Sequence, residues 1–283
     1  MKYSFQTDSD IVKQYRKEDA NYIIEVNENT SNKNLCVIYF TSNALYYPNN
    51  TQSFKHSVIE RNYYEWRLKV PISAKRQIFV RDIYKQWYLN GINNQISSPA
   101  SLLKLLKQES EGYNIITVGS SAGGYAAILY GSQLGAERIY AFNPQFEINS
   151  LLETSNEETN PLLFRNIHNI NLRQYYDIIP AIKHSQIYYF ISEKSNWDYN
   201  QMLHLGNNNQ VCTIKFKTSH HGVPFPRIAL KNVMSTSDAK LLTLDKKSFN
   251  PILFSIKFVG IWSTLIGLLM QSFEILRKRF IYE

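Results

Sequence analysis

The stretch that decides the fold runs from residue 115 to residue 124 and reads Ile-Ile-Thr-Val-Gly-Ser-Ser-Ala-Gly-Gly. Its first four residues form an apolar run typical of a buried strand. The Ala- and Leu-rich segment 122–134, which Gly135 follows, predicts a helix. A strand-to-helix turn that matches G-x-S-x-G is a nucleophile elbow, and the small residues beside the central serine relieve crowding in the turn. The motif predicts that Ser121 is a nucleophile.

A glycine-rich turn of this kind could also bind phosphate, either as a Walker loop or as a dinucleotide-binding loop. A Walker loop needs Lys-Ser or Lys-Thr after its last glycine, where this chain has Tyr125-Ala126. A dinucleotide-binding loop needs G-x-G-x-x-G, which is absent. An ordinary tight turn is the remaining alternative, and the strand before and helix after the motif favour the elbow.

Outward from the elbow, apolar runs bounded by turn signals alternate with helical patterns. Ser98 can cap a helix over 99–109, with Pro99 in its first turn. Strands separated by helices need crossover connections, so the pattern predicts an α/β fold with a mostly parallel central sheet flanked by helices. The expected strands are 22–26, 36–41, 77–80, 114–119, 138–142, 186–192 and 212–217.

A serine nucleophile needs a base, and the base needs an orienting acid; in α/β-hydrolases they follow in the order Ser, Asp or Glu, His. His221, followed by Gly222, is the expected base, with His220 as the alternative. Asp198 is the expected acid and is placed in a polar loop; Glu193, nearer the strand end, is the alternative and Asp177 a weaker one. The adjacent histidines could also form a solvated turn. A zinc site would need further ligands at matching spacing, so no metal is expected.

An acyl-transfer intermediate needs two N–H donors for its oxyanion. The first expected donor is the backbone N–H of Ala122, directly after the nucleophile. The second should lie in the loop after strand 36–41, where Ser42 or Asn43 could supply it.

Arg81, Trp87 and Tyr88 are the expected substrate-binding residues. A guanidinium at Arg81 suits a phosphate or carboxylate, although a salt-bridged turn beside Asp82 is an equal alternative. Trp87 and Tyr88 could stack on a sugar ring, or could simply pack in the core.

The composition is globular, with 44% hydrophobic and 19% charged residues in 283, and a formal net charge of +8. The basic residues are dispersed and accompany no nucleic-acid-binding motif, so nucleic acid is not an expected partner. Cys36 and Cys212 lie in apolar runs and are expected to be buried thiols. The first residues have no apolar core of signal-peptide length, so export by that route is not expected.

The C-terminal segment has a different character. Residues 258–273 carry no charge, and Arg277-Lys278-Arg279 follow. An interfacial amphipathic helix anchored by basic flanks is favoured over a helix packed on the domain or on a partner, and over a spanning helix. The expected domains are 1–240, with a small cap or insertion at about 145–184, and a helical tail at 241–283.

Several of these segments together resemble a known family. They are 78–82 (IFVRD), Trp87-Tyr88 with Gly91, the elbow, 141–145 (AFNPQ) and His221-Gly222. In this order they resemble α/β-hydrolase-fold proteins of bacterial surface-polysaccharide loci, which include capsule O-acetyltransferases of the meningococcal serogroup A type.

The resemblance covers roughly residues 20–235 and does not extend to the tail. It implies a triad on Ser121, Asp198 and His221, acetyl-CoA as acyl donor with no tightly bound cofactor, and a glycan hydroxyl as acceptor. It also implies a bacterial cytoplasmic enzyme, and the tail suits peripheral contact with the anionic inner face of the membrane. An esterase or deacylase with the same triad, and a non-catalytic glycan-assembly partner, are the alternatives.

Overall fold

One eight-stranded sheet, in the order β1-β3-β2-β4-β5-β6-β7-β8, organises the computed structural model, which describes residues 2–157 and 160–282. Only β1 runs antiparallel to its neighbour; all the other pairs are parallel, which confirms the mostly parallel sheet. The strands are β1 (Tyr22–Val26), β2 (Leu35–Phe40), β3 (Arg76–Val80), β4 (Asn114–Ser120), β5 (Arg138–Phe142), β6 (Gln186–Ser192), β7 (Val211–Phe216) and β8 (Ser248–Phe249).

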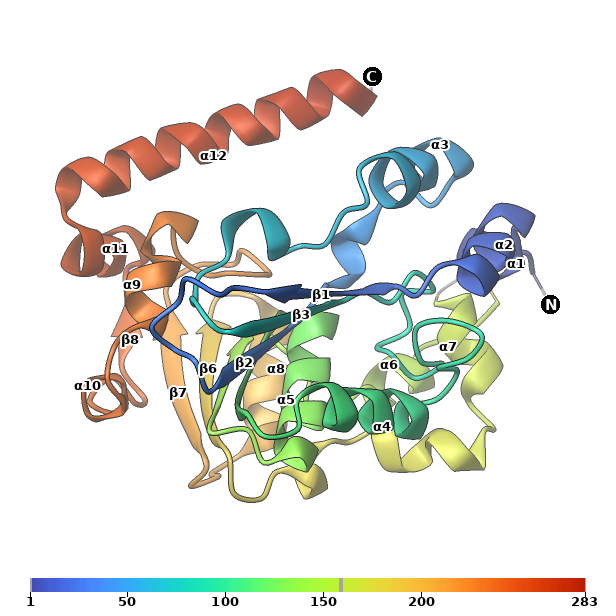
Figure 1. The fold of residues 1–283 in the computed structure, drawn as a ribbon, viewed down its shortest axis with the longest axis horizontal. Helices are drawn as coiled ribbons and strands as arrows, with labels where there is room; N and C mark the ends of the chain where they lie inside the picture. Colours follow the sequence, from blue (N-terminus) through green and yellow to red (C-terminus); the bar gives the residue numbers. More distant parts are fainter. Residues whose placement is uncertain (1, 158–159, 283) are drawn as a thin grey trace.

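The helices pack on both faces of this sheet (Figure 1). The α-helices are α1 (Phe5–Asp8), α2 (Asp10–Glu18), α3 (Thr51–Phe54), α4 (Pro99–Glu109), α5 (Ala122–Leu134), α6 (Asn149–Glu153), α7 (Pro161–Asn166), α8 (Asn196–Leu205), α9 (Leu230–Met234), α10 (Asp238–Leu242), α11 (Pro251–Val259) and α12 (Ile261–Tyr282). Short 3-10 or π turns are η1 (Asn43–Leu45), η2 (Lys55–Glu60), η3 (Arg67–Lys69), η4 (Ile170–Tyr175), η5 (Ile179–Ala181) and η6 (Arg227–Ala229).

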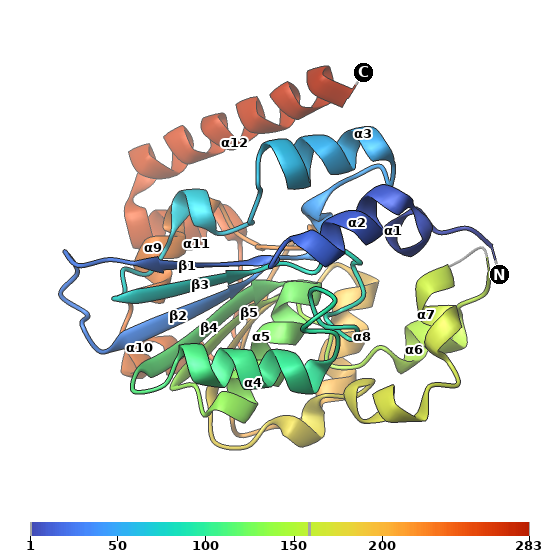
Figure 2. The ribbon, with the colours of Figure 1, turned by 45° about the vertical axis from the view of Figure 1, so that its right-hand side comes forward.

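The sheet separates two apolar cores, because successive side chains of a strand point to opposite faces. In β2, Ile38 and Phe40 join the core beneath α4 and α5, whereas Val37 and Tyr39 join the core beneath α9, α10 and α11. Figure 2 shows α4 and α5 on one side of the sheet and α9, α11 and α12 on the other. The inner strands β2, β4, β5 and β6 are therefore mostly apolar and buried, as parallel strands covered on both faces require.

The expected domain boundary after residue 240 is wrong, because the sheet and its core continue beyond it. Strand β8 pairs with β7, and Phe254 of α11 is 2% exposed. The Phe254 ring lies 4.9 Å from that of Phe216 and 5.1 Å from that of Phe225. Strand β8 is two residues long and has no sequence pattern of its own, so its position depends on pairing with β7.

Residues 145–184, the expected cap or insertion, connect β5 to β6 and contain α6, α7, η4 and η5. Leu152, Leu163 and Leu172 form a small separate cluster with Leu89. The N-terminal helices lie beside this segment, and the Arg165 side chain donates to both carboxylate oxygens of Asp8 at 2.8 and 2.7 Å. This insertion and the N-terminus therefore brace each other at one end of the molecule (Figure 2).

The two cysteines are free and buried, as expected. Burial raises the pKa of each thiol to about 12. Both thiols are therefore held in the unreactive protonated form.

Candidate active site

The turn between β4 and α5 holds Ser121 in a backbone conformation that side-chain-bearing residues rarely adopt. Its φ is 52° and its ψ is −124°. Neighbouring glycines make the turn sterically possible: a Cβ on Gly119 would lie 2.0 Å from the Gly123 carbonyl oxygen, and one on Gly123 would lie 2.4 Å from that of Phe40. Strain maintained by such packing is characteristic of functional turns. The turn has the geometry expected of a nucleophile elbow.

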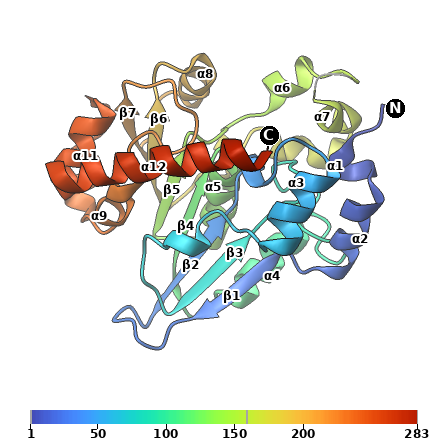
Figure 3. The same ribbon diagram turned by 90° about the horizontal axis from the view of Figure 1, so that it is seen from above.

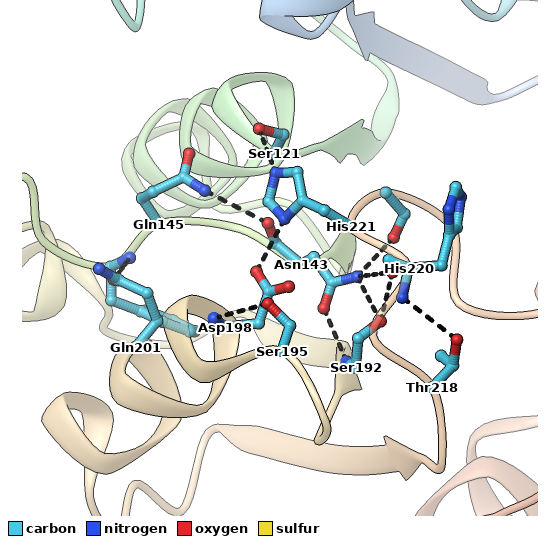
Figure 4. A network of polar contacts seen from close by, with 12 residues as sticks. Ser121, Asn143, Gln145, Ser192, Ser195, Asp198, Gln201, Thr218, His220 and His221 are labelled. Atoms are coloured by element: carbon cyan, nitrogen blue, oxygen red, sulfur yellow. Dashed lines mark hydrogen bonds and ion pairs between the residues drawn. The ribbon is translucent and has the colours of Figure 1, made fainter. Parts of the chain in front are cut away.

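Ser121, His221 and Asp198 form one hydrogen-bonded chain (Figure 4). The Oγ of Ser121 lies 2.8 Å from Nε2 of His221, and Nδ1 of His221 lies 2.9 Å from Oδ1 of Asp198. With Asp198 accepting from the Nδ1–H group, Nε2 is left to accept the serine proton. Ser121 and His221 are 100 residues apart in the sequence, and Asp198 and His221 are 23 apart. The three residues follow the carboxyl ends of the parallel strands β4, β6 and β7. The fold thus brings together the expected nucleophile, base and acid.

Asp198 lies in the first turn of α8 and not in a loop as expected. The N-terminal end of a helix favours negative charge. Its side chain is fully buried, and among the described residues Oδ2 has no hydrogen-bond partner. The histidine is therefore the principal partner of this carboxylate.

His221 is held from two further directions. The indole of Trp197 stacks on its ring, with centroids 5.6 Å apart and planes 6° apart. Its loop is tied down by the buried side chain of Asn143, which donates to the Gly222 carbonyl at 2.8 Å and to Oγ of Ser192 at 2.8 Å. The Asn143 side-chain oxygen Oδ1 also accepts from the Ser192 backbone N–H at 2.7 Å. Asn143 was not among the expected site residues; its position directly after an apolar strand was the available signal.

The alternative base and the two alternative acids lie elsewhere. His220 is exposed and turns away from Ser121 on the far side of the loop, where its backbone carbonyl accepts from Ser192 Oγ at 2.6 Å (Figure 4). The Glu193 carboxylate accepts from Ser248 Oγ of β8 at 2.6 Å. Asp177 is in contact with His204 at 2.9 Å. None of these three completes the chain to the serine.

The expected oxyanion donors lie around the same turn. Ala122 is the first residue of α5, where backbone N–H groups have no partner within the helix. The loop after β2 lies against this turn, as the approach of the Phe40 carbonyl to Gly123 shows. The Ser42 N–H, however, donates to Oε2 of Glu65 at 2.9 Å. Of the two residues expected to supply the second donor, this leaves Asn43, the first residue of η1.

Glu65 is a buried carboxylate beside the elbow turn that sequence reasoning missed. Its side chain is 8% exposed; Oε1 accepts from Oγ of Ser120 at 3.1 Å and lies 3.6 Å from the Arg227 guanidinium. Glu65 therefore connects the loop after β2 to the end of β4, the two segments that flank the expected oxyanion site. No motif surrounds it in the sequence, so no local signal could have identified it.

The expectation that Arg81 and Tyr88 bind substrate is wrong, because both side chains are buried in the body. The Arg81 guanidinium donates to Asn21 Oδ1 at 3.1 Å, to the Tyr63 carbonyl at 3.2 Å and to the Tyr15 hydroxyl at 3.0 Å. Tyr88 donates to the Thr41 carbonyl at 2.7 Å. Arg81 thus braces the N-terminal segment against β3, and Tyr88 supports the loop after β2.

Trp87, the third expected substrate-binding residue, is half-buried. Its indole N–H donates to Oε1 of Gln145 at 2.9 Å, two residues after Asn143. It therefore lies behind the site, against the segment that holds the histidine loop.

The site itself is open to solvent. The His221 side chain is 36% exposed and Trp197 is 42% exposed. No cluster of three or more metal-ligating side chains occurs among the described residues. An open serine–histidine–carboxylate chain can attack an acyl group and pass it to an acceptor that reaches it from solvent.

The sheet order, the crossovers and the elbow define the chain as an α/β-hydrolase-like protein. No protein-family model and no curated protein matches it. Among solved structures it is similar to the capsule O-acetyltransferase of Neisseria meningitidis serogroup A in complex with caged gadolinium, at 14% identity over 69% of this chain and 83% of that one, with a TM-score of 0.48.

Two further similar structures are an acetyltransferase variant and an esterase. A histidine-to-alanine mutant of the same meningococcal enzyme in complex with CoA is 15% identical over 69% of this chain and 82% of that one, with a TM-score of 0.44. An inhibited esterase B from Lactobacillus rhamnosis is 14% identical over 92% and 89%, with a TM-score of 0.43.

Proposed function

We propose that the protein is a serine-dependent acyltransferase that transfers an acetyl group from acetyl-CoA to a hydroxyl of a bacterial capsular or other surface polysaccharide. The observation that carries the acyl-transfer part of the proposal is the hydrogen-bonded chain Ser121–His221–Asp198. The donor and acceptor come from the resemblance in sequence to capsule O-acetyltransferases.

In the first half-reaction, Oγ of Ser121 attacks the thioester carbonyl carbon while Nε2 of His221 takes the hydroxyl proton. The oxyanion that forms is stabilised by the N–H of Ala122 and a second donor from the loop at Asn43. When the carbon–sulfur bond breaks, the thiolate takes the proton from His221 and leaves as free CoA. The product is an acetyl ester on Ser121.

In the second half-reaction, His221 removes a proton from the acceptor hydroxyl, whose oxygen attacks the ester carbonyl. The bond to Ser121 Oγ then breaks, and the serine regains its proton from His221. The open site suits this step, because a polymer chain can approach Ser121 without entering a deep cavity. Trp197 offers an exposed aromatic surface beside the base, where a sugar ring could pack.

The second candidate is an esterase or deacylase with the same three residues and water as acceptor. The same exposure favours it, because water reaches His221 as freely as a sugar hydroxyl does. A non-catalytic glycan-assembly partner is the third possibility, and it has no need of an aligned serine, histidine and buried aspartate.

One experiment separates the three. Purified protein is incubated with acetyl-CoA, with and without a capsule-type oligosaccharide, and free thiol and acceptor mass are followed. A gain of one acetyl group by the acceptor supports the transferase, and thiol release with unchanged acceptor supports the hydrolase. If wild type gives neither thiol release nor acceptor acetylation above the level of Ser121→Ala, the result would contradict an acyl-transfer enzyme. A binding role would then remain.

A further inference from the structure

The C-terminal helix α12 carries its apolar side chains on the face that points away from the body. Exposed side chains along it are Ile261, Trp262, Leu265, Ile266, Leu269, Met270 and Phe273. Their spacing of three to four residues marks one side of a helix. Trp262 is 78% exposed and Phe273 is 70% exposed, so this stripe is uncovered from end to end.

The opposite side of α12, which faces the body, is mostly small or polar: it carries Ser263, Thr264, Gly267 and Gln271, and Leu268 is half-buried beside them. Thr264 is fully buried and donates to the Gly260 carbonyl at 2.8 Å. Gly267 lies against η6, where an added Cβ would be 2.6 Å from the Ile228 side chain. Leu265 and Gly267 are two residues apart and so lie about 200° apart around the helix. An ordinary surface helix has the reverse arrangement, with its apolar side inward.

The position of α12 leaves this stripe accessible. The helix packs mainly against α11 and η6 at its beginning and is the outermost element on its side of the sheet in Figures 1 and 3. The apolar stripe from Ile261 to Phe273 is about 18 Å long at 1.5 Å per residue. None of the helices in the described part of the chain has the length and hydropathy needed to cross a bilayer.

The charges around the stripe favour one occupant. From Pro251 to Phe273 the single charged residue is Lys257, and the Lys240 ammonium lies 5.6 Å from the ring of Phe258 near the end of α11. The sequence continues into Arg277-Lys278-Arg279, whose side chains lie outside the described residues. Basic residues beside an apolar face attract an anionic lipid surface. A second copy would bring the same positive charges together.

We propose that α12 is an interfacial helix that binds the protein to anionic membranes, with the stripe 261–273 in the headgroup region and the small-residue side toward the body. Trp262 is suited to the interface, where amphipathic aromatic rings are enriched. The binding itself does not depend on the proposed reaction.

The full chain is tested by flotation with equimolar phosphatidylcholine–phosphatidylglycerol vesicles and with phosphatidylcholine vesicles alone. Wild type is expected to float with the anionic vesicles and to be released by high salt. Leu265→Glu/Leu269→Glu should reduce the bound fraction at least about tenfold, because two apolar contacts become charged. Ile170→Glu/Leu203→Glu is the matched control, with two similarly exposed apolar residues away from α12.

Thermal melting by circular dichroism establishes that both double variants are folded. Absence of wild-type flotation, or equal flotation of wild type and Leu265→Glu/Leu269→Glu, would overturn the proposal. An equal loss in the control variant would do the same, because the effect would then not belong to α12. A wild-type dimer that the α12 variant dissociates, without flotation, would assign the stripe to a second copy.

Discussion

At the residue scale, the site depends on which of two adjacent histidines faces the serine. His221 contacts both Ser121 and Asp198, whereas His220 turns outward. Gly222, with a φ of 116°, allows the loop to bend directly after the ring that enters the site. Substitution of His220 is therefore a matched control for substitution of His221.

His221→Ala should lower turnover by at least about a thousandfold, because it removes the base from a chain whose members act together. His220→Ala should leave turnover within a few-fold of wild type. The measurement is acetyl-CoA-dependent thiol release, with p-nitrophenyl acetate hydrolysis as a second readout. A large loss in His220→Ala alone would show that the two rings exchange places in the working enzyme.

The role of a single residue could be predicted from the sequence where a local motif accompanies it, and could not be predicted elsewhere. Ser121 could be placed from the sequence because its backbone conformation depends on adjacent small residues. Arg81 could not, because its partners Asn21, Tyr15 and Tyr63 are distant in the chain and their convergence on the guanidinium is decided by packing. Glu65 was missed for the same reason.

At the element scale, Glu65 connects the loop after β2 to the end of β4. Glu65→Ala would leave the buried Ser42 N–H and the Ser120 hydroxyl without this partner and should cost about 1–3 kcal/mol of unfolding free energy. Glu65→Gln should recover most of the loss, because its amide oxygen can accept from Ser42 and its amide N–H can donate to Ser120. Urea unfolding measures both. An equal loss in the two variants would instead assign the effect to the carboxylate charge beside Arg227.

The ends of helices that have both a capping signal and a stop signal could be predicted to within about a residue. Short elements without such signals could not be predicted. Helix 99–109 begins directly after its capping residue Ser98, and helix 122–134 ends directly before Gly135. The sequence of α8 mixes polar and aromatic residues without apolar periodicity, so its pattern predicts a loop around Asp198. Strand β8 is two residues long and depends wholly on its neighbour β7.

At the scale of the whole molecule, the last strand and α11 complete the second core. A chain ending after residue 260 should stay folded and active on p-nitrophenyl acetate, whereas one ending after residue 240 loses Phe254 and should be insoluble or unfolded. In the full chain, Phe254→Ala should cost about 3–5 kcal/mol. Soluble expression and urea unfolding check this. A stable, active chain ending at 240 would restore the boundary expected from the sequence.

The contact between the N-terminus and the insertion makes stability depend on pH. Hydrogen bonds from Arg165 hold the pKa of Asp8 well below its usual value. A lowered pKa in the folded state gives stability that is present above the unfolded value of about 4 and is lost as pH falls toward the folded value. Asp8→Asn should therefore be less stable than wild type near neutral pH, and the difference should shrink below about pH 4.

Urea unfolding midpoints measured across that pH range test this dependence. A difference between wild type and Asp8→Asn that stays constant with pH would contradict it, because the effect would then be one of packing and not of charge.

The stacked rings of Trp197 and His221 have an optical consequence. A protonated imidazole in contact with an indole quenches its fluorescence, whereas the neutral ring does so far less. The emission of Trp197 should therefore report whether His221 is protonated. Replacing the other three tryptophans with phenylalanine would let the protonation of His221 be followed by fluorescence, without any substrate or label.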